Sequence, residues 1–481
     1  MKRPFGWMAW IGLATFYCAP PIQHGARESR PNILVIIGDD MGVETLRSFG
    51  IGTDTPDTPT LDELATRGVR FTNVWAQAMC SPTRATILTG RYGFRTGVGR
   101  PTGVEVMGPM PEPPAVPEGV TEFIPTDGSV GGSSPPSWGI RSDEMTLPQT
   151  LRTRPDLGYQ TAAFGKWHLA DVRNGWEKHP NLVGFDYFSG LIRCCPESYF
   201  AWVKLVNGEF STETGYAVSD KVDDALDWLA AQEGDHPWFV WLAFNTAHTP
   251  IHLPPQELLR SDYSHLDPND PEQDRRPYFK AMIEAMDTEI GRLLGAIDRD
   301  VLDNTYVIFL GDNGTDSDVV AEPFRAGHVK ATVYNGGVHV PLLITGPGVT
   351  HGEQSDALVN TTDLFATLLD MAGAGLKAVP DDIVLDTISL MPYLTDPETP
   401  SIREWIYTDL FVTDEGVQSG QYAIRNEGYK LLVRYGAEEF YDLTADPYEY
   451  HDLLDGELSP PQRAQYESLR SQVEALHSSE R

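Results

Sequence analysis

The chain has 481 residues, of which 41% are hydrophobic and 22% are charged, a composition typical of a soluble globular protein. Its length is greater than one ordinary hydrophobic core supports, which favours a large domain joined to a smaller one. Because 69 Asp and Glu outnumber 36 Lys and Arg, the formal net charge is −33 at pH 7. Such a charge argues against nucleic-acid binding, and any anionic ligand would need a local cluster of cations.

The N-terminus has the pattern of an export signal and leader over residues 1–28. Lys2 and Arg3 precede an apolar run over residues 5–17 that is too short for a stable membrane span. We therefore expect an exported protein, periplasmic or secreted. Lipid attachment at Cys18 is disfavoured, because the residue before a lipidated cysteine is small and here it is a tyrosine.

Five short apolar runs are continuous rather than alternating, which indicates strands buried on both faces, as in a parallel sheet covered by helices. The runs cover residues 32–37, 160–164, 238–244, 306–310 and 340–345. Helical patterns lie between them, over residues 60–67, 219–231 and 278–297. This alternation predicts an α/β fold with a large, mostly parallel sheet flanked by helices.

Polar side chains follow the ends of four of these runs. Ligands of such sheets bind beyond the carboxyl ends of the strands, so these side chains should converge although they are far apart in sequence. In chain order they are Asp39 and Asp40, then Lys166 and His168, then His248, then Asp312 and Asn313.

Two segments depart from the α/β pattern. Residues from about 100 to 140 are rich in Pro and Gly and predict a long inserted loop near the cleft. From about residue 376, a meander of short strands and a helix over 461–477 predict a smaller α+β subdomain on an antiparallel sheet. The predicted domains are the leader 1–28, the α/β domain 29–375 and the C-terminal subdomain 376–481.

A cysteine-containing motif carries the most specific signal. Residues 80–84 read Cys-Ser-Pro-Thr-Arg and residues 88–90 read Leu-Thr-Gly, which predicts a short helix with Cys80 at its positively polarised N-terminus. A lone cysteine at such a place is more often simply buried. The whole string, however, resembles the sulfatase signature Cys-x-Pro-x-Arg followed by Leu-Thr-Gly, and the resemblance extends over nearly the whole chain after the leader.

This resemblance implies an alkaline-phosphatase-like fold and an arylsulfatase-like enzyme that hydrolyses aryl, alkyl or carbohydrate sulfate esters. A maturation enzyme would oxidise Cys80 to formylglycine. One oxygen of the hydrated aldehyde attacks sulfur and expels the alcohol, and the second hydroxyl then drives release of sulfate as the carbonyl re-forms.

The resemblance also implies a calcium site. Asp39, Asp40, Asp312 and Asn313, with residue 80, would supply oxygen ligands to one Ca²⁺. Taken separately, each pair of polar residues is more often a turn or a helix cap.

Cationic residues complete the expected site. Lys166 and His168, in Gly-Lys-Trp-His-Leu, would donate to the sulfate and to the aldehyde hydrate, and Lys330 matches a second sulfate-binding lysine. His248 matches a histidine near the leaving-group oxygen, and either it or Lys330 could protonate the departing alkoxide. Arg84 would hold residue 80 and the carboxylates through its fork of donors.

Some features fit the resemblance less well or leave alternatives open. Residues 335–341 read Asn-Gly-Gly-Val-His-Val-Pro where the family usually has Glu-Gly-Gly-x-Arg-Val-Pro, although neither changed position is an expected sulfate ligand. The adjacent Cys194 and Cys195 could form a vicinal disulfide, bind metal or be packed or free thiols, the last being favoured. Arg193, His252 and His328 could border the pocket.

Two other functions stay open at this point. Relatives with the same cysteine motif hydrolyse phosphonate monoesters or phosphodiesters, and a catalytically silent protein could bind sulfated glycans. The sequence carries no signal for the ester that is cleaved or for the oligomeric state.

Overall fold

The computed structural model describes residues 30–123, 138–232, 236–268, 270–272, 274–412 and 415–479. The predicted export signal and part of the predicted insertion, residues 124–137, lie outside the described residues. Within the described ranges, no helix is both long and apolar enough to span a bilayer.

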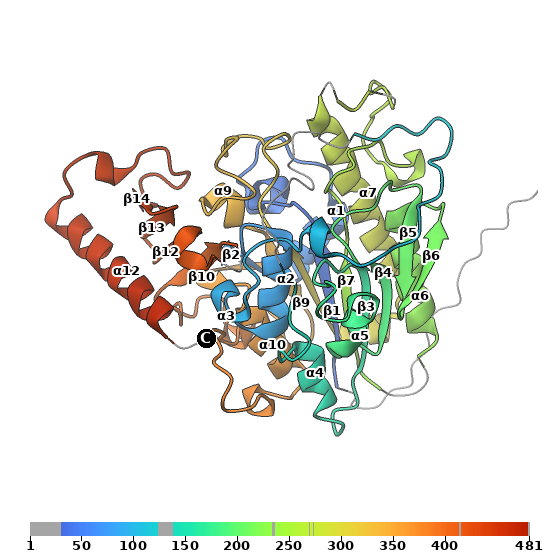
Figure 1. Cartoon of the computed structure of the whole chain (residues 1–481), viewed down its shortest axis with the longest axis horizontal. Helices are drawn as coiled ribbons and strands as arrows, with labels where there is room; N and C mark the ends of the chain where they lie inside the picture. Colours follow the sequence, from blue (N-terminus) through green and yellow to red (C-terminus); the bar gives the residue numbers. More distant parts are fainter. Residues whose placement is uncertain are drawn as a thin grey trace, which may run out of the picture.

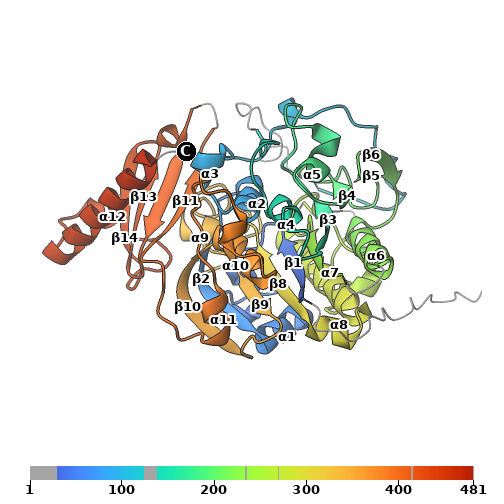
Figure 2. The same cartoon turned by 90° about the horizontal axis from the view of Figure 1, so that it is seen from below.

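A sheet of ten strands forms the centre of the larger part of the molecule (Figures 1 and 2). The strand order is β10-β2-β9-β8-β1-β7-β3-β4-β5-β6. The bounds are β1 (Asn32–Gly38), β2 (Val69–Trp75), β3 (Gln160–Lys166), β4 (Tyr187–Leu191), β5 (Trp202–Val206), β6 (Glu209–Glu213), β7 (Trp238–Ala243), β8 (Thr305–Gly311), β9 (Leu342–Thr345) and β10 (Glu353–Asn360).

The middle of this sheet is parallel, as the continuous apolar runs predict. Strands β8, β1, β7, β3 and β4 all run the same way, so the carboxyl ends of β1, β3, β7 and β8 meet at one edge. Strand β9 differs, because it runs antiparallel to both β2 and β8. The chain enters β9 from α9 (Asn335–Val338), which lies at the carboxyl edge of the sheet. Strand β9 therefore runs away from that edge, and none of the predicted site residues follows its end.

Helices cover both faces of the sheet (Figure 2). Ile33, Val35 and Ile37 of β1 face one core and Leu34 and Ile36 face the other, all fully buried. The first core contains α2 (Cys80–Thr89), α4 (Leu147–Arg152), α10 (Asp363–Met371) and α11 (Met391–Thr395). The second contains α1 (Pro59–Arg67), α6 (Ala217–Ala230), α7 (Arg275–Ala296) and α8 (Arg299–Asp303). The short helices α3 (Gly93–Thr96) and α5 (His179–Leu182) lie in the loops.

A separate antiparallel sheet of four strands forms the C-terminal part, as predicted. It is a meander of β11 (Ile406–Leu410), β12 (Gln421–Arg425), β13 (Tyr429–Arg434) and β14 (Ala437–Asp442). One face packs against α12 (Pro460–Ser478), and the other packs against Trp75 and the segment that contains α9. This second contact places the small sheet beside the carboxyl edge of the large one, close to the segment that carries Lys330. The domain boundary at residue 375 stays a prediction.

Candidate active site

Cys80 lies where the sequence predicts it, as the first residue of a short helix. Helix α2 is buried along its whole length, and Gly90 follows its last residue with a left-handed φ of 68° that caps the helix. The thiol is 2% exposed, and its Sγ lies 3.3 Å from Nδ1 of His168. Burial raises the pKa of the thiol, although the nearby Lys166 ammonium lowers it, so Cys80 is a neutral thiol in this environment.

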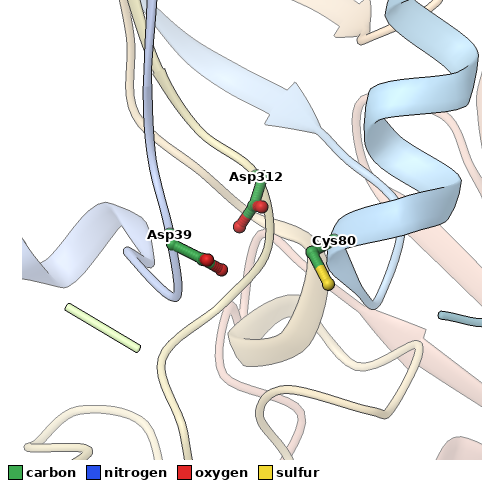
Figure 3. A group of neighbouring side chains, drawn as sticks. All are labelled: Asp39, Cys80 and Asp312. Carbon is green, nitrogen blue, oxygen red and sulfur yellow. The ribbon is translucent and has the colours of Figure 1, made fainter. Parts of the chain in front are cut away.

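Three side chains from three elements lie close together (Figure 3). Asp39 follows β1, Asp312 follows β8, and Cys80 begins α2. One ligand atom from each lies within 4.8 Å of the others, and all three are buried. Burial, reinforced by the charge of Asp39, raises the pKa of Asp312 to about 6. Burial raises the pKa of Asp39 as well, against the effect of Lys166.

Arg84 links the helix to these carboxylates. It lies one turn after Cys80, and its Nε and one terminal nitrogen donate to Oδ2 of Asp312 at 3.2 and 2.8 Å. The other terminal nitrogen donates to the backbone oxygen of Lys166 at 2.7 Å. Burial would lower the pKa of the guanidinium, but Asp312 and Asp39 raise it, so Arg84 is a fixed cation.

Two lysines hold the two adjacent aspartates. Nζ of Lys166 donates to Oδ2 of Asp39, and Nζ of Lys330 donates to Oδ2 of Asp40 at 2.6 Å. Burial opposes the charged form of each group. Pairing outweighs burial for the two lysines, whose pKa is raised, and for Asp40, whose pKa is lowered, but not for Asp39. With Arg84 and Asp312, three cations, two of them fully buried, balance three buried carboxylates.

The two predicted histidines approach different members of this cluster, His168 the thiol of Cys80 and His248 the carboxylate of Asp40. Nε2 of His168 lies 3.2 Å from the backbone oxygen of Thr102, which can only accept, so in the neutral ring Nε2 carries the proton and Nδ1 faces Cys80 as an acceptor. Nε2 of His248 lies 4.0 Å from Oδ2 of Asp40. Burial, with Lys166 for His168 and Lys330 for His248, lowers the pKa of both rings, that of His248 to about 3.

The backbone is unusual at two of these residues. Asp40 has a φ of 60° and His168 a φ of 56°, a left-handed conformation that is uncommon for side-chain-bearing residues. Such conformations persist where surrounding contacts enforce them, and they cluster at functional sites. In both cases the turn aims the side chain back into the cluster.

The cluster fits a hard divalent cation. Oδ1 of Asp39 and Oδ1 of Asn313 are buried, and neither has a hydrogen-bond partner within the described part of the chain. Nδ2 of Asn313 donates to Oδ1 of Asp40 at 2.8 Å, so the amide nitrogen is used within the cluster and the amide oxygen is left as an available ligand. A buried unsatisfied oxygen costs about 1–3 kcal/mol. Carboxylate and amide oxygens are the ligands that Ca²⁺ and Mg²⁺ prefer, whereas the Cys80 sulfur is a poor ligand for these ions.

The structure adds positioning residues that the sequence analysis missed. Thr102 accepts from His168, and its amide donates to Oγ of Ser81 at 3.2 Å, so the predicted insertion reaches the site. The hydroxyl of Tyr199 lies 2.6 Å from the backbone oxygen of Asn245 and 2.9 Å from that of His248, which braces the loop after β7. Neither residue belongs to a local motif, so no sequence signal pointed to it.

The three residues that were expected to border the pocket each contact a different neighbour. Arg193 pairs with Glu197, whereas His252 is fully buried beneath the ring of Tyr199, with ring centroids 4.3 Å apart. His328 stacks on the ring of Tyr334. Cys194 and Cys195 form a disulfide between neighbours, so the favoured interpretation of packed or free thiols was wrong. The sequence around them carried no information on their pairing.

Comparison with known proteins gives a consistent result. A family model described as "Sulfatase" matches residues 31–374, and one described as "N-sulphoglucosamine sulphohydrolase, C-terminal" matches residues 327–478. N-acetylgalactosamine-6-sulfatase of Homo sapiens is 30% identical over 393 residues, which is 76% of this chain and 66%, just under two thirds, of the relative. Arylsulfatase A of Homo sapiens is 29% identical over 452 residues, or 87% of this chain and 77% of the relative.

A solved structure is similar along nearly its whole length. The structure titled "Crystal structure of Ps i-CgsB in complex with k-i-k-neocarrahexaose" has a TM-score of 0.72 and 25% identity to this chain, with coverage of 93% of this chain and 92% of that one.

Proposed function

Because the chain belongs to the sulfatase family, with its alkaline-phosphatase-like fold, we propose that it hydrolyses an organic sulfate ester to an alcohol and inorganic sulfate. The observation that carries this proposal is the position of Cys80. It begins a buried helix, faces an unprotonated ring nitrogen of His168, and lies within 4.8 Å of two carboxylates. A sulfate bound there would lie among three cations that an otherwise acidic protein gathers in one place.

We propose that a formylglycine-generating maturation enzyme converts Cys80 to formylglycine. Its hydrate would supply the nucleophilic oxygen that a thiol lacks. Nδ1 of His168, 3.3 Å from the present Sγ, is positioned to accept a proton from a hydroxyl at this place. Arg84 keeps Asp312 oriented through two hydrogen bonds, and Lys166 and Lys330 are the donors nearest to where sulfate oxygens would bind.

The proton for the departing alkoxide has two candidate sources, His248 and Lys330. Burial lowers the pKa of His248 to about 3, so the ring is a neutral base without substrate. Lys330 keeps its proton through Asp40. We propose that Lys330 supplies the proton and that His248 orients the leaving oxygen. The pH profile of turnover, measured in a variant of each residue, would test this assignment.

We propose Ca²⁺ as the ion of the site. Asp39, Asp40, Asp312 and Asn313 would hold it, with residue 80 joining them only as formylglycine, since a thiol is a poor ligand for a hard cation. When bound, the cation would polarise a sulfate oxygen. Because the carboxylates and cations of the apo cluster balance, a divalent ion leaves a net positive site for an anion.

We propose a carbohydrate sulfate as the substrate and export as the destination. One curated relative is named for a sulfated amino sugar, and the similar structure holds an oligosaccharide of the carrageenan series. The N-terminal pattern of a charged start and a short apolar run supports export of the chain.

The direct test compares p-nitrophenyl sulfate with bis(p-nitrophenyl) phosphate, using protein made together with a maturation enzyme, in Ca²⁺ and after chelation. We expect faster sulfate turnover that falls on chelation and returns with Ca²⁺. Faster phosphodiester turnover would favour the phosphodiesterase alternative. Absence of turnover by formylglycine-containing protein would favour the silent glycan-binding one.

A further inference from the structure

An exposed tyrosine lies at the tip of the hairpin between β13 and β14. Tyr435 is 63% exposed, the most of any large hydrophobic side chain in the described ranges. Most such side chains are buried, and exposing an aromatic ring to water forfeits the free energy of its burial. The exposure of the Tyr435 ring therefore needs a physical explanation.

The backbone at Tyr435 adds a second cost. Arg434 pairs with Ala437, so Tyr435 and Gly436 form a two-residue hairpin loop, with φ of 52° and 88°. Turns with positive φ at both positions favour Asn-Gly, because a larger side chain is strained in the left-handed region. A bulky aromatic residue at the first position breaks this local preference, and such breaks concentrate at functional sites.

Hydrogen bonds join this hairpin tip to the active site. The side-chain amide nitrogen of Gln421 lies 3.4 Å from the hydroxyl of Tyr435 and 3.4 Å from the backbone oxygen of Ala331. Ala331 directly follows Lys330, and its amide donates to the backbone oxygen of Ala78, two residues before Cys80, at 2.9 Å. Figure 1 shows the small sheet next to α9, on the side of the molecule where these segments meet.

We propose that Tyr435 is a stacking platform for a sugar ring of a sulfated glycan whose sulfate is held beside Lys330. A tyrosine ring suits this ligand class because its flat apolar face covers the C–H groups of a sugar while its hydroxyl stays hydrated. The ring adds no negative charge to a strongly acidic protein, and Gln421 fixes the direction of its hydroxyl. This assignment rests on the proposed sulfatase function and names the part of the protein that would recognise the glycan.

The test measures binding by calorimetry in a Cys80→Ala background, which prevents turnover. The probes are carrageenan and chondroitin 6-sulfate hexasaccharides, each titrated into protein with and without a change at residue 435. Tyr435→Asn installs the residue that the turn prefers, so the melting temperature should stay the same or rise while the Kd for the best-bound hexasaccharide increases about tenfold. Tyr435→Phe keeps the ring and should stay within about twofold of the parent Kd.

The outcomes separate this assignment from the sulfatase proposal. An unchanged Kd in Tyr435→Asn, or absence of binding of every hexasaccharide by the parent protein, overturns the platform. Turnover of p-nitrophenyl sulfate by protein with the native Cys80 is measured separately, and its absence counts against the proposed function alone. A tenfold loss in Tyr435→Asn accompanied by a lower melting temperature also overturns the assignment, because it indicates general damage.

Discussion

Replacement of Arg84 by methionine tests the charge balance of the buried cluster. Methionine is also long and fills much of the same space, but it removes three hydrogen bonds, two to Asp312 and one to the backbone oxygen of Lys166. The side chains of Arg84 and Asp312 are fully buried. The change therefore leaves one carboxylate without its partner in a region that water does not reach.

The expected loss of stability follows from the protonation of Asp312 once its partner is removed. Its pKa is about 6 with Arg84 present, so taking up a proton at pH 7.5 costs about 2 kcal/mol at about 1.4 kcal/mol per unit. The unsatisfied oxygen of Lys166 adds about 1–3 kcal/mol. We therefore expect the free energy of unfolding to fall by about 3–5 kcal/mol, the range typical of a broken buried ion pair.

The assay is guanidinium denaturation at pH 7.5 with divalent cations chelated, so that metal binding does not contribute. Arg67→Met is the matched control, because Arg67 forms an exposed pair with Glu63 at 3.5 Å and should lose no more than about 0.5 kcal/mol. A loss below about 1 kcal/mol in Arg84→Met would refute the reasoning. It would mean that the cluster does not depend on its charge balance.

Substitutions at three further positions have distinct expected results. Cys80→Ala and Cys80→Ser should each abolish sulfate release while the circular dichroism spectrum stays native, and full activity in either variant would contradict the proposed nucleophile. Gly90→Ala should lower the free energy of unfolding by about 2–3 kcal/mol, because φ is 68° and the added Cβ would lie 2.8 Å from the ring of Phe365. A change of less than about 0.5 kcal/mol in urea denaturation would contradict this prediction. Burial raises the pKa of Asp409 from its ordinary 3.8 to about 7, so the folded state binds this proton more tightly than the unfolded chain does. The free energy of unfolding of the wild-type protein should therefore fall relative to that of Asp409→Asn as pH rises from about 4 to 7. A difference between the two proteins that does not change with pH would count against this prediction.

The sequence predicts the scaffold well because burial leaves a direct trace in composition. Buried parallel strands are continuous apolar runs, and the polar residues after β1, β3, β7 and β8 do meet at one edge. An apolar run, however, carries no information on strand direction, so it did not reveal that β9 is antiparallel. Helix α7 begins at Arg275, before the predicted residue 278, and its first turn contains ion pairs of Arg275 with Asp318 and of Arg276 with Asp54.

The site was less predictable where contacts are not local. The motif indicates Cys80 and Arg84 together because they lie one turn apart on a helix. The carbonyl of Thr102 and the hydroxyl of Tyr199 act on His168 and His248 from 66 and 49 residues away along the chain, through contacts that only the folded chain creates. The roles of the site residues therefore stay proposals, although their side chains lie together as expected.

Mass spectrometry of the peptide that contains Cys80 tests the central proposal most directly. The protein would be produced with and without a formylglycine-generating enzyme, and sulfate release from p-nitrophenyl sulfate would be measured on the same samples. We predict that CH₂–SH is replaced by CHO and that turnover rises in proportion to the modified fraction. Full turnover by protein in which Cys80 is entirely a thiol would contradict the account.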